Sequence, residues 1–450
     1  MSPLLMCKQV EIKRELIENY LSFFYNNAME RIDYILDFCK ELGKQMIVAG
    51  ANIERVDLCT ERICHAYGLH DVTCANLTTR ISISAKDEVK HYAHRQTDVP
   101  PQNLNLERLK KLNNLSYYVK NNTPDVTTLY DLLKSVKSND FPWWAMMIGY
   151  LVAMAALARM FIASPAELCV IEINTLVLFG LSKLFSKVHV NKIITNFLSM
   201  VLVSLIASLF FKIGFIEHFF VVLIVNAFYL LPGIQMINCA RNILCGNEMN
   251  GIIDLLKVFL EVCSIVAGVA AVYAVLGNAL GNPAIENAPT YLESTPRWVS
   301  NLELVILTLM ASAGFGVVFN IQLKDLGFAA LGGMIVRIVY ILFQMALPEY
   351  RFVFVALAAF FAALYSEILA ISRKEPSTLY LYPSIVPLIP GDLFVYVGLG
   401  FMWTDFAIAD NARNLALTLL GVSLGFVLCS TIVHYVRKFK FMKKFADDSK

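Results

Sequence analysis

Two stretches of the chain interrupt long apolar runs with the same dipeptide: "FYLLPGIQMINCARNILCGNEMNG" (Phe228–Gly251) and "SIVPLIPGDLFVY" (Ser384–Tyr396). Proline removes a backbone donor and clashes with the preceding turn, and glycine adds backbone freedom. Pro232-Gly233 and Pro390-Gly391 therefore predict a break in each apolar segment. Such a break is tolerated at membrane depth only where protein or water satisfies the freed backbone groups.

The chain around these breaks has the composition of a membrane protein. Of its 450 residues, 57% are hydrophobic and 16% are charged, and its mean hydropathy is +0.58; an average soluble domain carries about 25% charged residues. The net charge of +2 indicates no particular class of partner. The ten cysteines show no paired framework in a polar external loop, so we expect them to be reduced. The charged N-terminal stretch does not resemble a signal peptide.

The apolar part of the chain divides into ten runs, each long enough to cross about 30 Å of hydrocarbon. We place them near 143–163, 166–186, 193–212, 215–240, 252–276, 301–320, 326–347, 351–371, 379–402 and 410–436. Basic residues gather in every second connection and at the C-terminus, as in "KLFSKVHVNK", "SRK" and "RKFKFMKK". The positive-inside rule then predicts a multi-pass protein of the cell (inner) membrane, with both termini in the cytoplasm.

The predicted organisation has a small α+β domain ahead of the membrane spans. We assign residues 1–138 to this cytoplasmic domain, 139–276 to a first five-helix membrane half, 277–300 to an extracytoplasmic loop, 301–436 to a second five-helix half and 437–450 to a basic cytoplasmic tail. Apolar spacing predicts helices over 30–50 and 52–68, and further helices near 105–118 and 125–137. "HDVTCANLTTRISISA" (70–85) predicts two short strands, and "HYAH" (91–94) reads as a loop or surface segment.

Five spans in each half place the second half upside down relative to the first. The Pro-Gly pair falls in the fourth span of both halves, and paired interruptions in inverted repeats indicate the substrate site of a transporter. The exposed ends of the half-helices would present amides to a carboxylate and carbonyls to a cation. The alternative is that both pairs are structural kinks, because proline and glycine are common in membrane helices.

Four ionisable residues lie near the middle of predicted spans: Glu172, Glu261, Arg337 and Asp392. A charge at the bilayer centre costs roughly 2.5–3.5 kcal/mol on insertion scales, so each should pair, face a cavity or titrate. We assign Arg337 to a substrate carboxylate, because its planar fork matches that group. Asp392 is assigned to a substrate amine or a coupling proton, with Glu172 and Glu261 as further proton carriers. A structural ion pair of Arg337 with Asp392 or Glu172 is the alternative.

Polar residues after the first break complete the predicted substrate site, which consists of Pro232, Gly233, Gln235, Asn238, Arg337, Pro390, Gly391 and Asp392. Helix–helix hydrogen bonding explains Gln235 or Asn238 equally well. Cys59, Cys64, His65 and Cys74 lack the short C-x-x-C spacing of a zinc site, so we expect no metal site. Neither a nucleotide-binding motif nor a nucleophile elbow is legible, so we expect no cofactor, no nucleic-acid partner and no catalytic residues.

One helix of the N-terminal domain resembles a family signature. "AGANIERVDLCTERICHAYG" is similar to the N-terminal signature of the bacterial threonine/serine exporter family, at Gly50, Ala51, Arg55, Val56, Asp57, Glu61, Arg62, Ile63, Tyr67 and Gly68. The two Pro-Gly segments and the order of parts also resemble that family, over most of residues 31–436. Asn52 stands where the family pattern suggests an acidic residue. Related two-chain systems are associated with export of dicarboxylates such as succinate.

The leading hypothesis is a secondary exporter of small polar metabolites, threonine and serine first, driven by the proton gradient as an antiporter and compatible with a homo-oligomer. A second hypothesis keeps the fold and takes a four-carbon dicarboxylate, which calls for two cationic contacts where only Arg337 lies deep in the membrane. A third, a membrane-anchored hydrolase, needs a nucleophile and base that residues 1–138 do not reveal.

Overall fold

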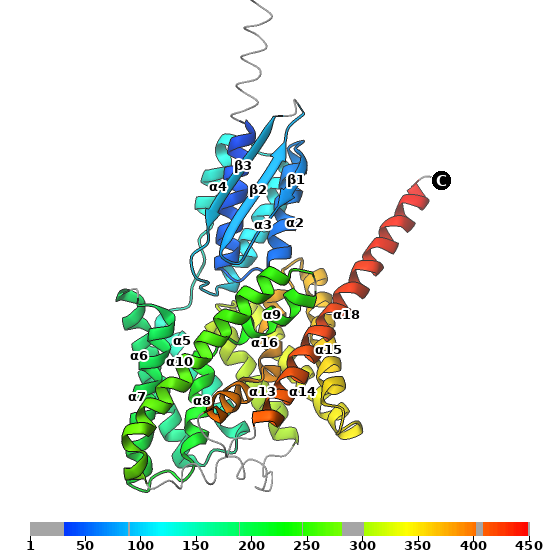
Figure 1. The fold of residues 1–450 in the computed structure, drawn as a ribbon. Helices are drawn as coiled ribbons and strands as arrows, with labels where there is room; N and C mark the ends of the chain where they lie inside the picture. The colour runs from blue at the N-terminus through cyan, green and yellow to red at the C-terminus, as the bar shows by residue number, and fades with distance from the viewer. Residues whose placement is uncertain are drawn as a thin grey trace, which may run out of the picture. The chain divides into compact units, whose positions relative to one another are not determined.

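The computed structural model describes residues 31–88, 91–188, 190–244, 246–280, 301–401 and 408–448. Contacts divide the chain into two compact units, Met1–Asn139 and Asp140–Lys450. We call them the N-terminal unit and the membrane unit and describe each by itself (Figure 1). The predicted external loop falls largely on 281–300, outside the described residues.

The N-terminal unit combines helices with one antiparallel sheet of order β1-β2-β3. A helix over residues 31–48 precedes α2 (Ile53–Ala66), β1 (His70–Cys74), β2 (Arg80–Lys86), β3 (Tyr92–Asp98), α3 (Leu106–Asn122), the 3-10 helix η1 (Val126–Thr128) and α4 (Leu129–Ser135). The turn after this first helix contains Gly50, whose φ of +103° is one that side-chain-bearing residues avoid. The expected helices and the first two strands are confirmed.

A third strand was not expected. β3 pairs with β2 along seven residue positions, from Arg80 opposite Asp98 to Lys86 opposite Tyr92. Its sequence, "YAHRQTD", lacks the regular hydrophobic alternation typical of a strand, and only Ala93 in it is buried. His94 therefore lies on an exposed face of a strand and not in a loop, since pairing with the buried strand β2 outweighs weak local preference.

The membrane unit is entirely helical over the residues that the structure describes. Its elements are α5 (Trp143–Met160), α6 (Pro165–Val188), α7 (Lys192–Lys212), α8 (Phe219–Leu230), α9 (Gly233–Leu244), α10 (Glu248–Leu280), α13 (Asn301–Val318), α14 (Leu323–Ala346), α15 (Arg351–Arg373), α16 (Thr378–Ile385), the 3-10 helix η2 (Val386–Leu388), α17 (Gly391–Gly400) and α18 (Ile408–Asp448). The tail expected at 437–450 continues α18 as a helix to Asp448.

Two bent helix pairs decide how many spans the unit has. Eight described helices are long and apolar enough to cross a membrane, and the count reaches ten if each bent pair forms one span. The pair α8 and α9 bends by 65°, and the pair ending at Leu388 and beginning at Gly391 bends by 47°. Both predicted breaks are therefore present, because proline cannot continue the hydrogen-bond ladder.

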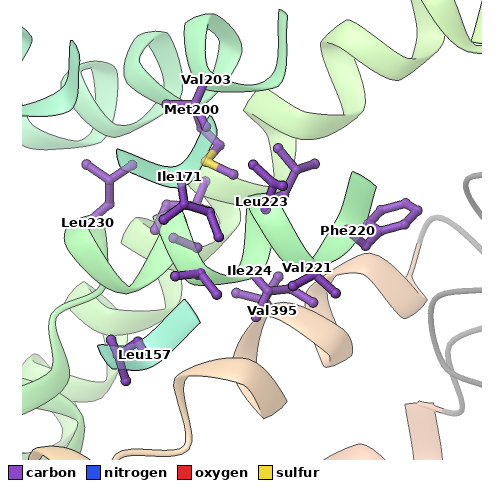
Figure 2. Packing of buried hydrophobic residues seen from close by; sticks show 14 of the residues in the cluster. Leu157, Ile171, Met200, Val203, Phe220, Val221, Leu223, Ile224, Leu230 and Val395 are labelled. Atoms are coloured by element: carbon purple, nitrogen blue, oxygen red, sulfur yellow. The ribbon is translucent and has the colours of Figure 1, made fainter. Parts of the chain in front are cut away.

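The first helix of the first broken pair is buried within the membrane unit. All residues from Phe219 to Ala227 are buried, so α8 is apolar around its whole circumference. In Figure 2, Ile171 and Met200 approach α8 from neighbouring helices, and Val395 of α17 reaches it from the second half of the chain. Because α8 contacts α17, the two broken pairs pack against each other.

Candidate functional site

A cavity of about 650 Å³ opens beside the second break. Residues from seven α-helices and from the segment 386–390 line it: Leu157, Met160, Phe161, Ile162, Phe228, Leu304, Arg337, Tyr340, Gln344, Arg351, Val355, Val386, Pro387, Leu388, Ile389, Pro390, Asp392, Tyr396, Asp410, Asn411, Asn414 and Thr418. We call this space the open cavity. Its volume falls within the range of about 300–1,000 Å³ typical of small-molecule sites.

Three of the predicted substrate residues line the open cavity: Arg337, Pro390 and Asp392. Arg337 comes from the second half of α14, and Asp392 lies in the first turn of α17, directly after the break. The structure thus brings the one predicted cation and the one predicted anion of this half into the same space. The two residues are 55 positions apart in the sequence, and α15 and α16 lie between them in the chain.

A threonine hydroxyl orients the Arg337 guanidinium. The Thr308 hydroxyl donates to the carbonyl oxygen of Leu304 at 2.7 Å, which leaves its oxygen to accept from Nε of Arg337 at 3.1 Å. The guanidinium also lies 5.5 Å from the ring centroid of Tyr340, within the distance of a cation–π contact. These two contacts hold the charged fork at the cavity wall.

A second arginine reaches the open cavity in the same manner, and the sequence reasoning missed it. Nε of Arg351 donates to the Thr418 hydroxyl at 3.0 Å, and that hydroxyl donates to the Asn414 carbonyl oxygen at 2.7 Å. Arg351 also interacts electrostatically with Asp392. Arg351 begins α15, so in the sequence its stretch "PEYR" reads as a connection between spans. The sequence signal that could have identified Arg351 is a threonine within another apolar run, because each arginine donates to such a threonine.

The polar residues after the first break do not line the open cavity. Pro232, Gly233, Gln235 and Asn238 are absent from its wall, and Oε1 of Gln235 is buried without a hydrogen-bond partner in the described part of the chain. The break itself still contributes, because Phe228 lines the cavity from the last turn of α8.

The two Pro-Gly breaks cross each other at close range. A Cβ atom at Gly391 would lie 2.7 Å from Cε1 of Phe228 and 2.9 Å from Cδ1 of Leu231. A Cβ atom at Gly233 would lie 2.7 Å from Cδ1 of Ile389. Each glycine therefore admits the segment that precedes the other proline, which explains why the dipeptide is needed in both places.

The two glutamates predicted to carry protons lie away from the open cavity. Both carboxyl oxygens of Glu172 on α6 are buried and have no hydrogen-bond partner among the described residues. Glu261 on α10 forms an ion pair with Lys192 of α7, with Nζ and Oε2 2.8 Å apart. Neither glutamate is among the residues that line the cavity with Arg337 and Asp392.

The signature residues of the N-terminal unit serve its packing. Asp57 accepts a hydrogen bond from Nδ2 of Asn76 at 2.7 Å, and Oδ1 of Asn76 accepts from the backbone N–H of Ser82 at 2.9 Å, which ties α2 to β2. Burial raises the pKa of Asp57 to about 6, against the lowering effect of the Asn76 hydrogen bond. The Tyr67 hydroxyl donates to the carbonyl oxygen of Pro124 at 2.6 Å.

Comparison with known families accounts for most of the chain. The family model ThrE, described as a threonine/serine exporter, matches residues 37–276. A second model of the same description, ThrE_2, matches residues 304–432. No curated protein and no solved structure matches the chain. With its multiple membrane-spanning helices and these two matches, the chain belongs to the threonine/serine exporter family.

Proposed function

We propose that the protein exports threonine and serine by secondary transport and that the open cavity is its substrate site. The observation that carries the proposal is the presence of Arg337 and Asp392 on the wall of one cavity at the second break. A zwitterionic amino acid carries one carboxylate and one ammonium group. Arg337 would bind the carboxylate through its planar fork, and Asp392 would accept hydrogen bonds from the ammonium group.

The environment of the two charges supports this assignment. An ionised group inside the bilayer costs roughly 2.5–3.5 kcal/mol on insertion scales, and facing a cavity or a partner reduces that cost. Thr308 and Tyr340 hold Arg337 in one orientation, so the guanidinium does not have to be ordered when substrate arrives. Pre-organisation of this kind improves affinity by lowering the entropy lost on binding.

We also propose that the ten spans, counting each bent pair as one, form two inverted halves with both termini in the cytoplasm. The basic connections and the crossing of two equivalent breaks support this arrangement. Leu304, Arg351 and Asp410 lie in the opening turns of α13, α15 and α18, which follow connections expected outside the cytoplasm. The open cavity would then face away from the cytoplasm.

Coupling to the proton gradient is assigned to Asp392, because this carboxylate contacts both the cavity and the break. Glu172 is a second candidate, since its buried oxygens have no hydrogen-bond partner in the described chain. Glu261 would first have to leave its ion pair with Lys192. In an antiporter, binding of a proton and of the substrate ammonium group at one carboxylate would exclude each other.

Flux in proteoliposomes tests these assignments. Vesicles loaded with radiolabelled threonine should lose it faster under an inward proton gradient, and Asp392→Asn should abolish the gradient dependence. Asp410→Asn is the matched control, because Asp410 lines the same cavity but is exposed and ion-paired with Arg413. Threonine and serine loss equal to that of protein-free vesicles would refute the function, and gradient-dependent loss from Asp392→Asn would refute the coupling role alone.

The open cavity offers the second cation that a dicarboxylate needs, but it also holds an anion. Arg351 supplies the second cation that a dicarboxylate would need, but its guanidinium already interacts with Asp392 and with Thr418. The cavity thus presents an anion beside its second cation, which suits a zwitterion better. Competition of succinate against threonine in the same vesicles separates the two substrates, and strong inhibition by succinate would favour the dicarboxylate.

A further inference from the structure

Positions in the two halves of the membrane unit correspond at a constant spacing. α5 (Trp143–Met160) and α13 (Asn301–Val318) begin and end 158 residues apart, 301 being 143 plus 158. The same spacing relates α6 (Pro165–Val188) to α14 (Leu323–Ala346), and Gly233 at the start of α9 to Gly391 at the start of α17. Residues of the two halves can therefore be equated one by one through both breaks.

A pair of side-chain contacts supports this correspondence in three dimensions. Nδ2 of Asn226 donates to the carbonyl oxygen of Ile171 at 3.1 Å. The Ser384 hydroxyl donates to the Tyr380 carbonyl oxygen at 2.6 Å, and its oxygen lies 3.5 Å from the carbonyl oxygen of Ala329. Asn226 and Ser384, like Ile171 and Ala329, are 158 residues apart in the sequence. The helix before each break thus packs on the second helix of its own half, α8 on α6 and α16 on α14.

The wall of the open cavity has a counterpart in the first half. Thr308, Arg337, Tyr340 and Pro387 correspond to Tyr150, Phe179, Ser182 and Tyr229. In the second half, the arginine, the tyrosine and the proline line the open cavity. In the first half, the four equivalent residues pack on one another, and we call them the tyrosine cluster.

Tyr229 holds the tyrosine cluster together. Its hydroxyl lies 3.1 Å from that of Ser182, and its ring centroid lies 4.2 Å from that of Tyr150. Phe179 packs edge-on against Tyr150 at 6.2 Å. Pro387, the residue equivalent to Tyr229, has a short side chain that cannot reach across, so the same place stays open in the second half.

We propose that the tyrosine cluster is the closed counterpart of the open cavity, a second solute-facing site that opens toward the other face of the membrane when Tyr229 moves out. This inference rests on the proposed function of transport. Tyr229 lies three residues before Pro232, so a change of bend at the first break displaces its ring directly. Solute would then pass from the Ser182 side to the Arg337 side across the crossed breaks.

The chemistry at the edge of the cluster fits an amino acid. Phe179 replaces Arg337 at the equivalent position, so the cluster itself holds no cation. Lys183, the exposed residue after Ser182, places its Nζ 5.2 Å from the ring of Phe179 and 5.9 Å from that of Trp143. An exposed ammonium group beside the cluster would attract a carboxylate without binding it as firmly as an oriented arginine fork.

Labelling of introduced cysteines with a membrane-impermeant maleimide tests the proposal. Ser182→Cys reports on the tyrosine cluster, and Tyr340→Cys, 158 residues later, is its matched control in the open cavity. The chain without an introduced cysteine gives the baseline for the native thiols. The reagent is applied to one face of oriented vesicles at a time, without any amino acid present.

We expect Tyr340→Cys to react readily from one face and Ser182→Cys to react slowly from the other. Adding Tyr229→Ala should speed labelling of Ser182→Cys roughly five- to thirty-fold, because an aromatic stack and a hydroxyl contact are lost. Tyr229→Phe, which keeps the ring, should give a smaller increase and serves if the alanine variant does not fold. Size-exclusion chromatography checks folding.

Rapid labelling of Ser182→Cys with Tyr229 intact, labelling from the same face as Tyr340→Cys, or rates unaffected by either Tyr229 variant would each overturn the proposal. These outcomes are independent of the solute. A protein that fails to move threonine but shows the expected labelling would refute the proposed substrate and leave the second site standing.

Discussion

Replacing Thr308 by valine should weaken threonine binding by releasing Arg337. Valine keeps the branched shape of threonine but cannot accept the hydrogen bond that Nε of Arg337 donates at 3.1 Å. Hydrogen bonds to charged groups contribute about 1.5–3 kcal/mol in soluble proteins, and those between membrane helices average about 0.6 kcal/mol. Thr308 is buried and its partner Arg337 lines the open cavity, so we expect a value between these two, a loss of about 1–2 kcal/mol, which is a roughly 5–30-fold weaker affinity.

Titration calorimetry of the purified protein with threonine measures this loss. Thr308→Ser should retain most of the affinity, because serine keeps the hydroxyl. Ser366→Ala is the matched control: the Ser366 hydroxyl is also fully buried and donates to a carbonyl oxygen four residues earlier, Ala362 at 2.8 Å, but on α15 and outside the cavity wall. Its loss should leave threonine affinity unchanged.

The comparison between the two variants decides whether the reasoning holds. If Thr308→Val binds threonine as tightly as the unmodified protein, or no more weakly than Ser366→Ala does, then Arg337 does not depend on this hydroxyl or does not bind the carboxylate. A matching loss in Thr308→Ser would show that shape, and not the hydroxyl, is responsible.

Two further predictions concern stability. Gly391→Ala should destabilise the detergent-solubilised protein by about 1–3 kcal/mol, because the new methyl group meets the rigid ring of Phe228. The loss would be measured as a lower thermal midpoint. Gly233→Ala should destabilise it less, since only the flexible end of Ile389 comes within 3.0 Å, and an equal effect of the two variants would contradict the crossing of the breaks. The pKa of Asp57 rises on folding from 3.8 to about 6, so the carboxyl binds its proton more tightly in the folded unit and stability falls as the pH rises through about 4 to 6. Asp57→Asn should therefore raise the free energy of opening of α2 by about 1–2 kcal/mol at pH 7, after solvent screening, and leave it unchanged at pH 4. Hydrogen exchange of the α2 amides in the whole protein measures this free energy. A larger difference between variant and unmodified protein at pH 4 than at pH 7 would contradict the predicted direction of the pH dependence.

The position of the breaks was predictable because it depends on local chemistry. Proline and glycine act on the backbone within one turn, so Pro232-Gly233 and Pro390-Gly391 end α8 and begin α17 where the sequence indicates. β3 escaped prediction for the opposite reason, since its seven polar-rich residues form a strand only by pairing with β2.

The lining of the open cavity was only partly predictable. The cost of charge in lipid singled out Arg337 and Asp392 in long apolar runs, and both line the cavity. Arg351 was missed because it begins a helix, where charge is unremarkable, and its role comes from Thr418 on a helix 67 residues away. Gln235 and Asn238, which we expected at a site between the two breaks, are not among the residues that line this cavity; α9, which carries them, packs on α10 and α18.

The sequence by itself therefore determined a membrane chain with two broken helices, since hydropathy and backbone breaks are properties of neighbouring residues. Only the tertiary structure decided that the breaks cross, that two arginines and an aspartate share a cavity, and that the equivalent place in the first half is filled by Tyr229. Those relations depend on which faces of distant helices meet, and packing settles that by matching small residues to bulky ones across the interface.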